Sequence, residues 1–334
     1  GRTVVRTGGV ANGDFVVEAG RNVHGKCIMK AASARKPRAV ALTKIIPGSP
    51  EQMNYRHIYH AGNFADVLKH AVLARLIAYL EQKDKAFRVL DTHAGIGLYD
   101  LTSDEAQKTG EWRDGIGRLL DGKLPANVAP LLAPYLDAVT AVNPGGGVRF
   151  YPGSPRIARH LLRSQDRLSL MELHPEDAAI LAAGFAGDYQ TRVTHLDGWL
   201  ALNAHLPPKE KRGLVLIDPP FEEEGEYRRL VDGLAKAHRR FPGGVYCLWY
   251  PIKKGAPIAE FHAALEALEI PKILCVELSV KSDRDTTGLS GSGLIIVNPP
   301  FTLKGELDTL LPFLKDRLAQ DRFASIRNGW IRGE

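Results

Sequence analysis

The stretch Gly213-Leu-Val-Leu-Ile-Asp-Pro-Pro-Phe221 decides the fold of this 334-residue chain. Its first five residues form an unbroken apolar run with the length and composition of a buried strand. A tetrad of one acid, two prolines and one aromatic ring, Asp218 to Phe221, follows that strand directly. In an open α/β sheet, ligands bind at the edge where the strands have their carboxyl ends. We therefore expect a functional site at Asp218.

Six further runs have the same strand-like character, at 87–90, 167–173, 191–196, 245–250, 273–280 and 294–297. Helical patterns lie between or around them, at 61–82, 154–164, 175–186, 225–240, 256–268 and 304–319. Alternating strands and helices predict a mostly parallel sheet with helices on both faces. The last two strands lack a long helix between them, so we expect them to pair antiparallel. The sequence thus predicts an α/β fold with a seven-stranded sheet, the Rossmann-like pattern of a class I methyltransferase.

The interval between the first two strands is too long for one crossover helix. It contains helix-compatible sequence with several prolines and closes with Asn143-Pro-Gly-Gly-Gly147. We interpret 99–148 as a small inserted helical subdomain and assign 53–98 together with 149–334 to the main domain. Insertions at this edge lie over the site and often govern substrate choice. Residues 1–52 lack sustained periodicity, so we expect an extension that is disordered or non-native.

Composition and charge restrict the classes of function. The chain contains no run of the roughly 18–20 apolar residues that a membrane span needs, and its three cysteines form no CxxC spacing, which fits a cytoplasmic protein. The formal charge of +6 comes from residues 1–52, which carry nine Lys/Arg and three Asp/Glu. The body of the chain is therefore neutral overall. Any nucleic-acid binding there must depend on local patches.

The tetrad suits methyl transfer to an exocyclic amine. The Asp218 carboxylate can accept a hydrogen bond from a planar NH2 group, and the Pro219 carbonyl can accept the other. Phe221 offers a flat face on which a flipped-out base can stack. An ordinary strand-to-loop turn is the alternative interpretation, because Asp-Pro commonly starts turns. Asn298-Pro-Pro-Phe301 matches the same pattern, but we prefer Asp218 because its strand lies at the centre of the predicted sheet.

The loop Asp91-Thr-His-Ala-Gly95-Ile-Gly97 follows the first strand. A dinucleotide fingerprint would need a third glycine at position 100, where the chain has Asp100. The loop therefore disfavours NAD and suits a cofactor without a pyrophosphate, such as S-adenosylmethionine. Gly95 allows a ligand to approach the backbone closely, whereas His93 can contact the cofactor or merely cap the next helix.

Acidic residues end the next two strands. Glu172 can accept both ribose hydroxyls of a nucleoside cofactor, although a favourable charge at a helix N-terminus is the alternative. Asp197 can accept the adenine amine beside Gly198, unless Asp197-Gly198 is only a turn. Ser154 is fully explained as a helix cap ahead of Pro155, and a ligand contact there is also possible.

These residues together resemble the RlmJ family of 23S rRNA adenine-N6 methyltransferases, from Met53 almost to the end of the chain. The most specific match is Tyr55-Arg-His-Ile-Tyr-His-Ala-Gly-Asn-Phe-Ala-Asp-Val-Leu-Lys-His70, and Tyr151-Pro-Gly-Ser-Pro155 and Ile217-Asp-Pro-Pro-Phe221 add to it. Phe221 stands where family members often have Tyr. The family's inserted helical subdomain also fits the long interval after the first strand.

The resemblance implies a role for each matching position. It places the cofactor against His70, His93, Gly95, Ser154, Glu172, Asp197, Gly198 and Asp218. It makes Asp218, with Pro219 and Phe221, the catalytic group. It turns the segment from Tyr55 to His70 into a lid over cofactor and base, so that Tyr55, Lys69 and Phe221 contact the RNA.

We therefore expect S-adenosylmethionine-dependent N6-methylation of one adenine in 23S rRNA by a monomer. No metal is expected, because His57, His60 and His70 have no matching set of further ligands. A guanine-N2 rRNA methyltransferase is the nearest rival, since the tetrad also suits that amine. More distant rivals are a DNA adenine methyltransferase, a non-catalytic RNA-binding or assembly factor with the same fold, and an NAD-dependent oxidoreductase.

Overall fold

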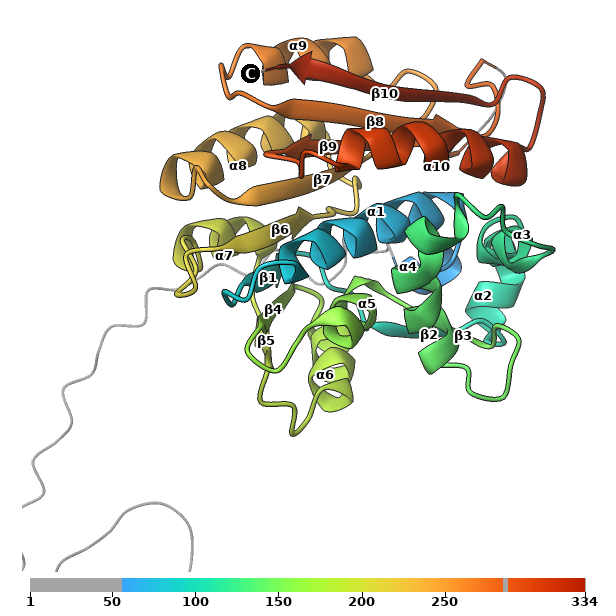
Figure 1. Cartoon of the computed structure of the whole chain (residues 1–334), viewed down its shortest axis with the longest axis horizontal. Coiled ribbons are helices and arrows are strands. Elements are labelled where there is room, and N and C mark those ends of the chain that lie inside the picture. The colour runs from blue at the N-terminus through green and yellow to red at the C-terminus, as the bar shows by residue number, and fades with distance from the viewer. Residues whose placement is uncertain (1–55, 285–287, 334) are drawn as a thin grey trace, which may run out of the picture. The chain divides into compact units, whose positions relative to one another are not determined.

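The computed structural model describes residues 56–284 and 288–333. They form an eight-stranded sheet with the order β10-β8-β9-β7-β6-β1-β4-β5, and a separate two-stranded sheet of β2 and β3 (Figure 1). The predicted extension at 1–52 and the predicted RNA contact Tyr55 lie outside the described residues. Among the described residues, no helix is both long enough and apolar enough to cross a membrane.

All seven predicted strands are present in the large sheet: β1 (Arg88–Asp91), β4 (Arg167–Glu172), β5 (Thr191–His195), β6 (Gly213–Ile217), β7 (Val245–Ile252), β8 (Ile273–Ser279) and β9 (Gly291–Val297). The first five pair parallel with one another, whereas β9 is antiparallel to both β7 and β8. The antiparallel end and the Rossmann-like α/β class are therefore confirmed.

The number of strands was predicted wrongly. An eighth strand, β10 (Ser325–Arg332), pairs antiparallel with β8 and forms the edge of the sheet. It contains Asn328-Gly329, a common turn signal, and the register shifts between Trp330 and Arg332. Most of its residues are at least partly exposed, so it also lacks the apolar run of a buried strand.

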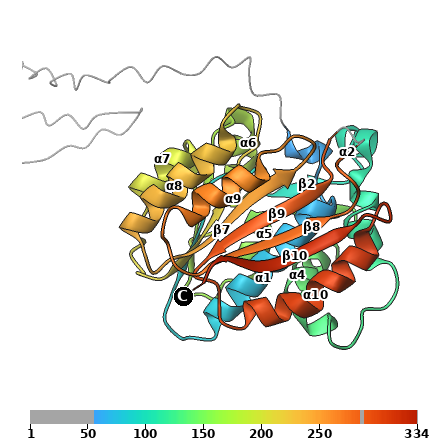
Figure 2. The ribbon, with the colours of Figure 1, turned by 90° about the horizontal axis from the view of Figure 1, so that it is seen from above.

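Helices cover both faces of the sheet (Figure 2). One apolar core lies beneath α1 (Phe64–Glu81), α5 (Ser154–Leu161), α6 (Pro175–Gly184) and α10 (Leu303–Leu318). A second core lies beneath α7 (Gly198–Ala204), α8 (Glu226–Arg240) and α9 (Ile258–Glu266). Only α7 was not predicted; it is short, and its capping residue Asp197 was interpreted as a ligand or a turn.

Residues 99–148 contain three α-helices, α2 (Asp104–Thr109), α3 (Ile116–Leu120) and α4 (Ala129–Ala141), and the 3-10 helix η3 (Glu111–Arg113). The antiparallel pairing of β2 (Leu98–Asp100) with β3 (Phe150–Pro152) brings the two ends of this region together. The helix α4 packs on α1 and α5 and contributes Leu132 and Tyr135 to the first core. The region is thus built onto the same core as the helices around it.

The sheet topology separates the two similar tetrads. The strand β6 lies beside β1 at the centre of the parallel part, so Asp218 stands at the carboxyl edge. The strand β9 runs the opposite way, and its last residue, Val297, pairs with Tyr246 near the start of β7. Asn298 therefore lies at the opposite edge, where its amide donates to the carbonyls of Pro242 and Gly244. The preference for Asp218 agrees with this topology.

Candidate active site

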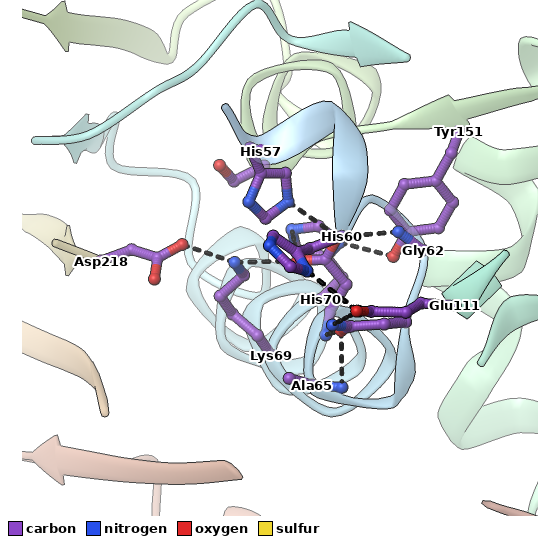
Figure 3. Close-up of polar contacts among 12 residues, drawn as sticks. His57, His60, Gly62, Ala65, Lys69, His70, Glu111, Tyr151 and Asp218 are labelled. Carbon is purple, nitrogen blue, oxygen red and sulfur yellow. Dashed lines mark hydrogen bonds and ion pairs between the residues drawn. The ribbon is translucent and has the colours of Figure 1, made fainter. Parts of the chain in front are cut away.

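A buried ammonium group meets the tetrad at the carboxyl edge. Lys69, in the second turn of α1, places Nζ 2.5 Å from Oδ2 of Asp218 and 2.9 Å from Oδ1 of Asp66 (Figure 3). The Lys69 side chain is only 5% exposed. Burial opposes its charge, but Asp218 and Asp66 outweigh this effect and raise the pKa of Lys69. The lysine is therefore a fixed cation between two carboxylates, not a proton donor or acceptor near neutral pH.

Asp66 connects this lysine to the start of the described chain. Its Oδ2 atom lies 2.9 Å from Nε2 of His57, in the 3-10 helix η2 (His57–Tyr59), and accepts the Gly62 N–H. Burial opposes ionisation of Asp66, but the charges of His57 and Lys69 lower its pKa well below the usual range. Asn63 caps α1 by accepting the N–H groups of Ala65 and Asp66, which explains why the helix begins at Phe64.

The inserted region holds the same turn from the other side. Glu111 of η3 accepts a hydrogen bond from Asn63 at 3.0 Å and lies 3.1 Å from Nδ1 of His60. Burial opposes the proton on His60, but the hydrogen bond to Glu111 dominates and raises its pKa. The entry into α1 is therefore fixed by a residue more than forty positions away in the sequence.

His70 faces a tyrosine pair. Its Nδ1 atom lies 2.8 Å from the hydroxyl of Tyr151, which lies 2.9 Å from the hydroxyl of Tyr135. Burial lowers the pKa of His70 to about 3, so the ring is neutral. His70 is almost fully buried, and its contact with the Tyr151 hydroxyl explains the orientation of its ring. The predicted cofactor contact stays a prediction.

The aromatic residue of the tetrad lies in a cluster of rings. Phe221 meets Tyr227 edge-on with ring centroids 4.9 Å apart, and Trp249 at 5.7 Å. Its φ of +54° is uncommon for a residue with a side chain, and it turns the chain sharply after the prolines. The Lys69 ammonium lies 5.8 Å from the centroid of Trp249. A base that stacked on Phe221 would thus lie near the Tyr227 and Trp249 rings and the Lys69 ammonium.

Asp91 ends β1, next to β6, and its side chain is buried. Its Oδ2 atom accepts the Ser154 hydroxyl at 2.7 Å, and its Oδ1 atom accepts the His93 N–H at 3.3 Å. Burial raises the pKa of Asp91 to about 7, and the nearby charge of Asp218 adds to the rise. Ser154 is therefore directed at this carboxyl group. A cationic ligand at Asp91 would relieve the cost of its ionisation.

Glu172 ends β4 and orders the glycine loop. Its two oxygens accept the N–H groups of Gly95 and His174, both at 2.8 Å. Gly95 has a φ of +60°, and a Cβ atom there would lie against the Tyr99 hydroxyl. Burial raises the pKa of Glu172. Each carboxylate oxygen has a second lone pair for further hydrogen bonds.

Asp197 follows β5 and caps α7 by accepting the Trp199 N–H at 2.7 Å. Its other oxygen lies 3.8 Å from the Arg229 guanidinium. Gly198 packs tightly on the glycine loop, since a Cβ atom there would lie 2.2 Å from the Thr92 carbonyl oxygen. The ring of His93 lies edge-on to Trp199, and burial lowers the pKa of His93 to about 3. His93, Gly95, Glu172, Asp197 and Gly198 therefore lie at the ends of β1, β4 and β5, in one half of the edge.

Sequence reasoning missed Asp66, Trp249 and Arg229. Asp66 had a recognisable signal, because a carboxylate three positions before Lys69 on a helix faces the same way. The contacts of Trp249 and Arg229 depend on the folded chain. Lys69, predicted to touch RNA, is paired with two carboxylates in this structure, and its contact with RNA stays a prediction.

A second polar cluster lies away from this edge. His262, Cys275 and Glu277 bring potential metal ligand atoms within 4.8 Å of one another. The Tyr250 hydroxyl lies 3.0 Å from Nε2 of His262 and donates to Glu277, while Arg327 contacts Nδ1 of His262 at 2.9 Å. Because a guanidinium only donates, Nδ1 accepts and Nε2 carries the ring proton. The arrangement is a hydrogen-bonded network in this tautomer.

A Rossmann-like sheet with carboxyl groups at the ends of β1 and β4 and after β5, and with an Asp-Pro-Pro-Phe tetrad after β6, is the architecture of a class I methyltransferase. The family model described as "Ribosomal RNA large subunit methyltransferase D, RlmJ" matches residues 84–332. The chain belongs to this RlmJ family of methyltransferases.

Two curated relatives carry the name ribosomal RNA large subunit methyltransferase J. The one from Escherichia coli K12 is 45% identical over 280 residues, which cover 84% of this chain and 99% of the relative. The one from Haemophilus influenzae is 44% identical over 284 residues, which cover 84% of this chain and all of the relative. A crystal structure of a Legionella pneumophila protein matches with a TM-score of 0.73 and 38% identity, covering 81% of this chain and 98% of that one.

Proposed function

We propose that this chain transfers a methyl group from S-adenosylmethionine to N6 of one adenine in 23S ribosomal RNA, and that it acts as a monomer. The observation that carries the proposal is the buried Lys69–Asp218 contact at the centre of the carboxyl edge. It holds a charged acceptor where an amine would meet the cofactor. The two relatives with 45% and 44% identity, both named for the large-subunit rRNA, supply the class of substrate.

The side chains along β1, β4 and β5 fit the cofactor. Asp91, a buried carboxyl group that accepts hydrogen bonds from Ser154 and the His93 N–H, suits the ammonium group of a methionine moiety. Glu172 suits the ribose hydroxyls and Asp197 the adenine amine, with Gly95, Gly198, His93, His70 and Ser154 around them. When bound, S-adenosylmethionine supplies an electrophilic methyl group on its sulfonium sulfur.

The tetrad positions the nucleophile. The Asp218 carboxylate and the Pro219 carbonyl accept hydrogen bonds from the two N–H groups of the amine, and this turns the nitrogen toward the methyl group. Phe221 stacks on the flipped base. Lys69 holds the Asp218 carboxylate in one orientation, and Asp218 can then stabilise the charge that develops on the amine and take up its proton during or after transfer.

The surroundings of α1 limit what reaches this site. We assign Tyr55 and the segment up to His70 to a lid over the base, and 99–148 to a substrate-selecting subdomain. The contacts of Glu111 with His60 and Asn63 support this assignment, because they couple the inserted region to the lid. Lys69 then serves the substrate through Asp218, and its ammonium lies near the place of the base.

The test is methyl transfer from labelled S-adenosylmethionine to unmodified large-subunit rRNA, followed by digestion to nucleosides and mass spectrometry. The parent chain is expected to form N6-methyladenosine and Asp218→Ala to form none. Asn298→Ala, in the second tetrad, is the matched control and is expected to retain transfer. N2-methylguanosine as the product would assign the chain to the rival chemistry. Product formed by Asp218→Ala at the parent rate would remove Asp218 from the reaction.

A further inference from the structure

We infer that the carboxyl edge continues beyond the tetrad as an RNA-docking surface formed by Lys253, Lys254, Lys281, Arg284, Arg322 and Phe323. We call it the distal patch. It rests on the proposed function, because it deepens the account of the same substrate. Its ligand is an unpaired stretch of RNA beside the target adenine, bound through phosphates and one stacked base.

The patch is contiguous although three separate segments build it. The Ser290 N–H donates to the Ile252 carbonyl at the end of β7, and the Lys281 N–H donates to the Ser290 carbonyl. The Gln320 N–H donates to the Val280 carbonyl, which ties the start of β10 to the end of β8. The segments that carry the basic residues, after β7, after β8 and before β10, are therefore linked by backbone hydrogen bonds.

The charge of the patch is mostly positive. Lys253, Lys254, Arg284 and Arg322 are exposed, and the described residues provide no ion pair for them. Asp283 and Asp321 lie within it, where the two oxygens of Asp321 accept the N–H groups of Ser282 and Phe323. Lys253 also lines a pocket together with Glu222, Glu223, Glu224 and Glu260. Since the body of the chain is neutral overall, this local excess of cations is the kind of feature that RNA binding requires.

A hollow of about 270 Å³ lies within the patch, and its lining includes Lys281, Asp283, Phe323 and the hydroxyls of Ser279, Ser282 and Ser325. Phe323 is 57% exposed, so its ring is accessible to a ligand. The Arg322 guanidinium lies over that ring, 4.9 Å from its centroid. Aromatic rings, serine hydroxyls and cations together suit a nucleotide, because they serve its base, its sugar and its phosphate.

The position of the patch decides what it would bind. The half of the edge formed by β1, β4 and β5 carries the predicted cofactor residues, and Asp218 on β6 stands at the boundary. The patch lies on the other half, at the ends of β7 and β8 and the start of β10, with β9 between β7 and β8 (Figure 2). RNA whose adenine reaches Asp218 must continue over one side of it. On this side the distal patch offers it Lys254, Lys281 and Arg322.

The experiment measures binding of the full chain to a protein-free, unmodified large-subunit rRNA transcript at several salt concentrations, without cofactor. The test variant is Lys254→Ala/Lys281→Ala/Arg322→Ala. The matched control is Lys83→Ala/Lys85→Ala/Lys209→Ala, which removes three exposed lysines before β1 and β6 at the opposite edge. Methyl-transfer kinetics on the same transcript give a second readout, and Phe323→Ala is compared with Phe323→Tyr.

We expect the test variant to bind roughly tenfold more weakly at low salt and to lose about two to three from the slope of log K against log salt. The control variant should keep the slope of the parent. In kinetics, the test variant should raise KM for RNA and leave kcat unchanged, and Phe323→Tyr should restore what Phe323→Ala loses. Equal slopes in the test and control variants would overturn the assignment of the distal patch as an RNA-docking surface.

The outcome is separable from that of the proposed function. A parent chain that binds RNA through the patch but forms no methylated adenosine would remove the proposed reaction and keep the surface. A parent that methylates adenine while the test variant keeps the binding and KM of the parent would remove the surface and keep the reaction. Binding of a protein, and not of RNA, to the patch would also overturn it.

Discussion

The Lys69 ammonium lies 2.5 Å from the Asp218 carboxylate and joins it to Asp66, which is buried inside the domain. A strand end and a helix of distant sequence are thus held together by charge. The arrangement fixes the orientation of the Asp218 carboxylate through an ammonium group that is itself buried. It also means that removing the lysine leaves two carboxylates without their shared cation.

The first prediction concerns this lysine. Lys69→Met should lower kcat for methyl transfer by about 100-fold or more, because Asp218 loses its orientation and its cationic partner. It should also lower the free energy of unfolding by about 3–5 kcal/mol, since Asp66 is left buried with less compensation. Asp66→Asn/Lys69→Met should recover part of the stability and none of the kcat. A double variant with normal kcat would contradict the role given to Lys69.

The second prediction follows from Asp91. Its pKa of about 7 in the folded chain lies above its value of about 4 when unfolded, so the folded state binds the proton more tightly. The contribution of this group to the free energy of unfolding should therefore fall as the pH rises from about 4 to about 7 and stay level above. Denaturant unfolding of the parent and Asp91→Asn between pH 5 and 8 measures the difference. Parallel stability curves would show that Asp91 ionises normally.

The affinity for S-adenosylmethionine should follow the opposite trend. If the ionised Asp91 holds the ammonium group, the dissociation constant should decrease as the pH rises toward about 7 and level off above it. Calorimetry at pH 5.5, 6.5 and 8 with Asp91→Asn as the comparison gives the profile. An affinity that does not change over this range would place the ammonium elsewhere.

Most of the sheet was predictable because buried strands leave apolar runs, and β6 is buried at every position. Asp218 and Glu172 could be proposed from the sequence because a polar residue ends or follows such a run there, and their roles stay predictions. The strand β10 was not, since it is an exposed edge strand with Asn328-Gly329 in its middle. An edge strand needs no apolar run, and its pairing with β8 comes from tertiary context.

The helix α1 shows a second reason why sequence patterns fall short. An apolar face was visible in the sequence, but the helix is buried on nearly all sides, and Asp66, Lys69 and His70 are buried with it. Charged residues on a helix usually face solvent, so pattern alone misplaces them. Only the folded chain provides Asp218, Tyr151 and the inserted region as the partners that make their burial tolerable.

The third prediction uses Gly198, which packs against the loop after β1. Gly198→Ala places a Cβ atom 2.2 Å from the Thr92 carbonyl oxygen, so the loop or α7 must move. We expect a loss of about 1–3 kcal/mol in the free energy of unfolding and weaker cofactor binding. Gly305→Ala in α10 has nothing within 4 Å of its Cβ and is the matched control. It should be neutral or stabilise by about 0.5–1 kcal/mol, and equal effects of the two changes would contradict the packing argument.

The fourth prediction separates the two tetrads by their aromatic residues. Phe221 lies in a ring cluster beside Asp218, whereas Phe301 is 86% exposed and lies at the opposite edge. Phe221→Ala should lower kcat/KM for rRNA by about five- to 150-fold, which corresponds to one lost base stack of about 1–3 kcal/mol. Phe221→Tyr should stay within a few-fold of the parent, because the flat face is kept.

The second tetrad should respond in stability and not in catalysis. Phe301→Ala should leave kcat/KM unchanged. Asn298→Ala removes two hydrogen bonds to the carbonyls of Pro242 and Gly244 at a φ of +53°, and should cost about 1–3 kcal/mol of unfolding free energy. Thermal unfolding and methyl transfer, measured on all four variants, check both parts. Loss of transfer in Phe301→Ala without loss of folding would move the substrate to the other edge of the sheet, and with it the assignment of Asp218.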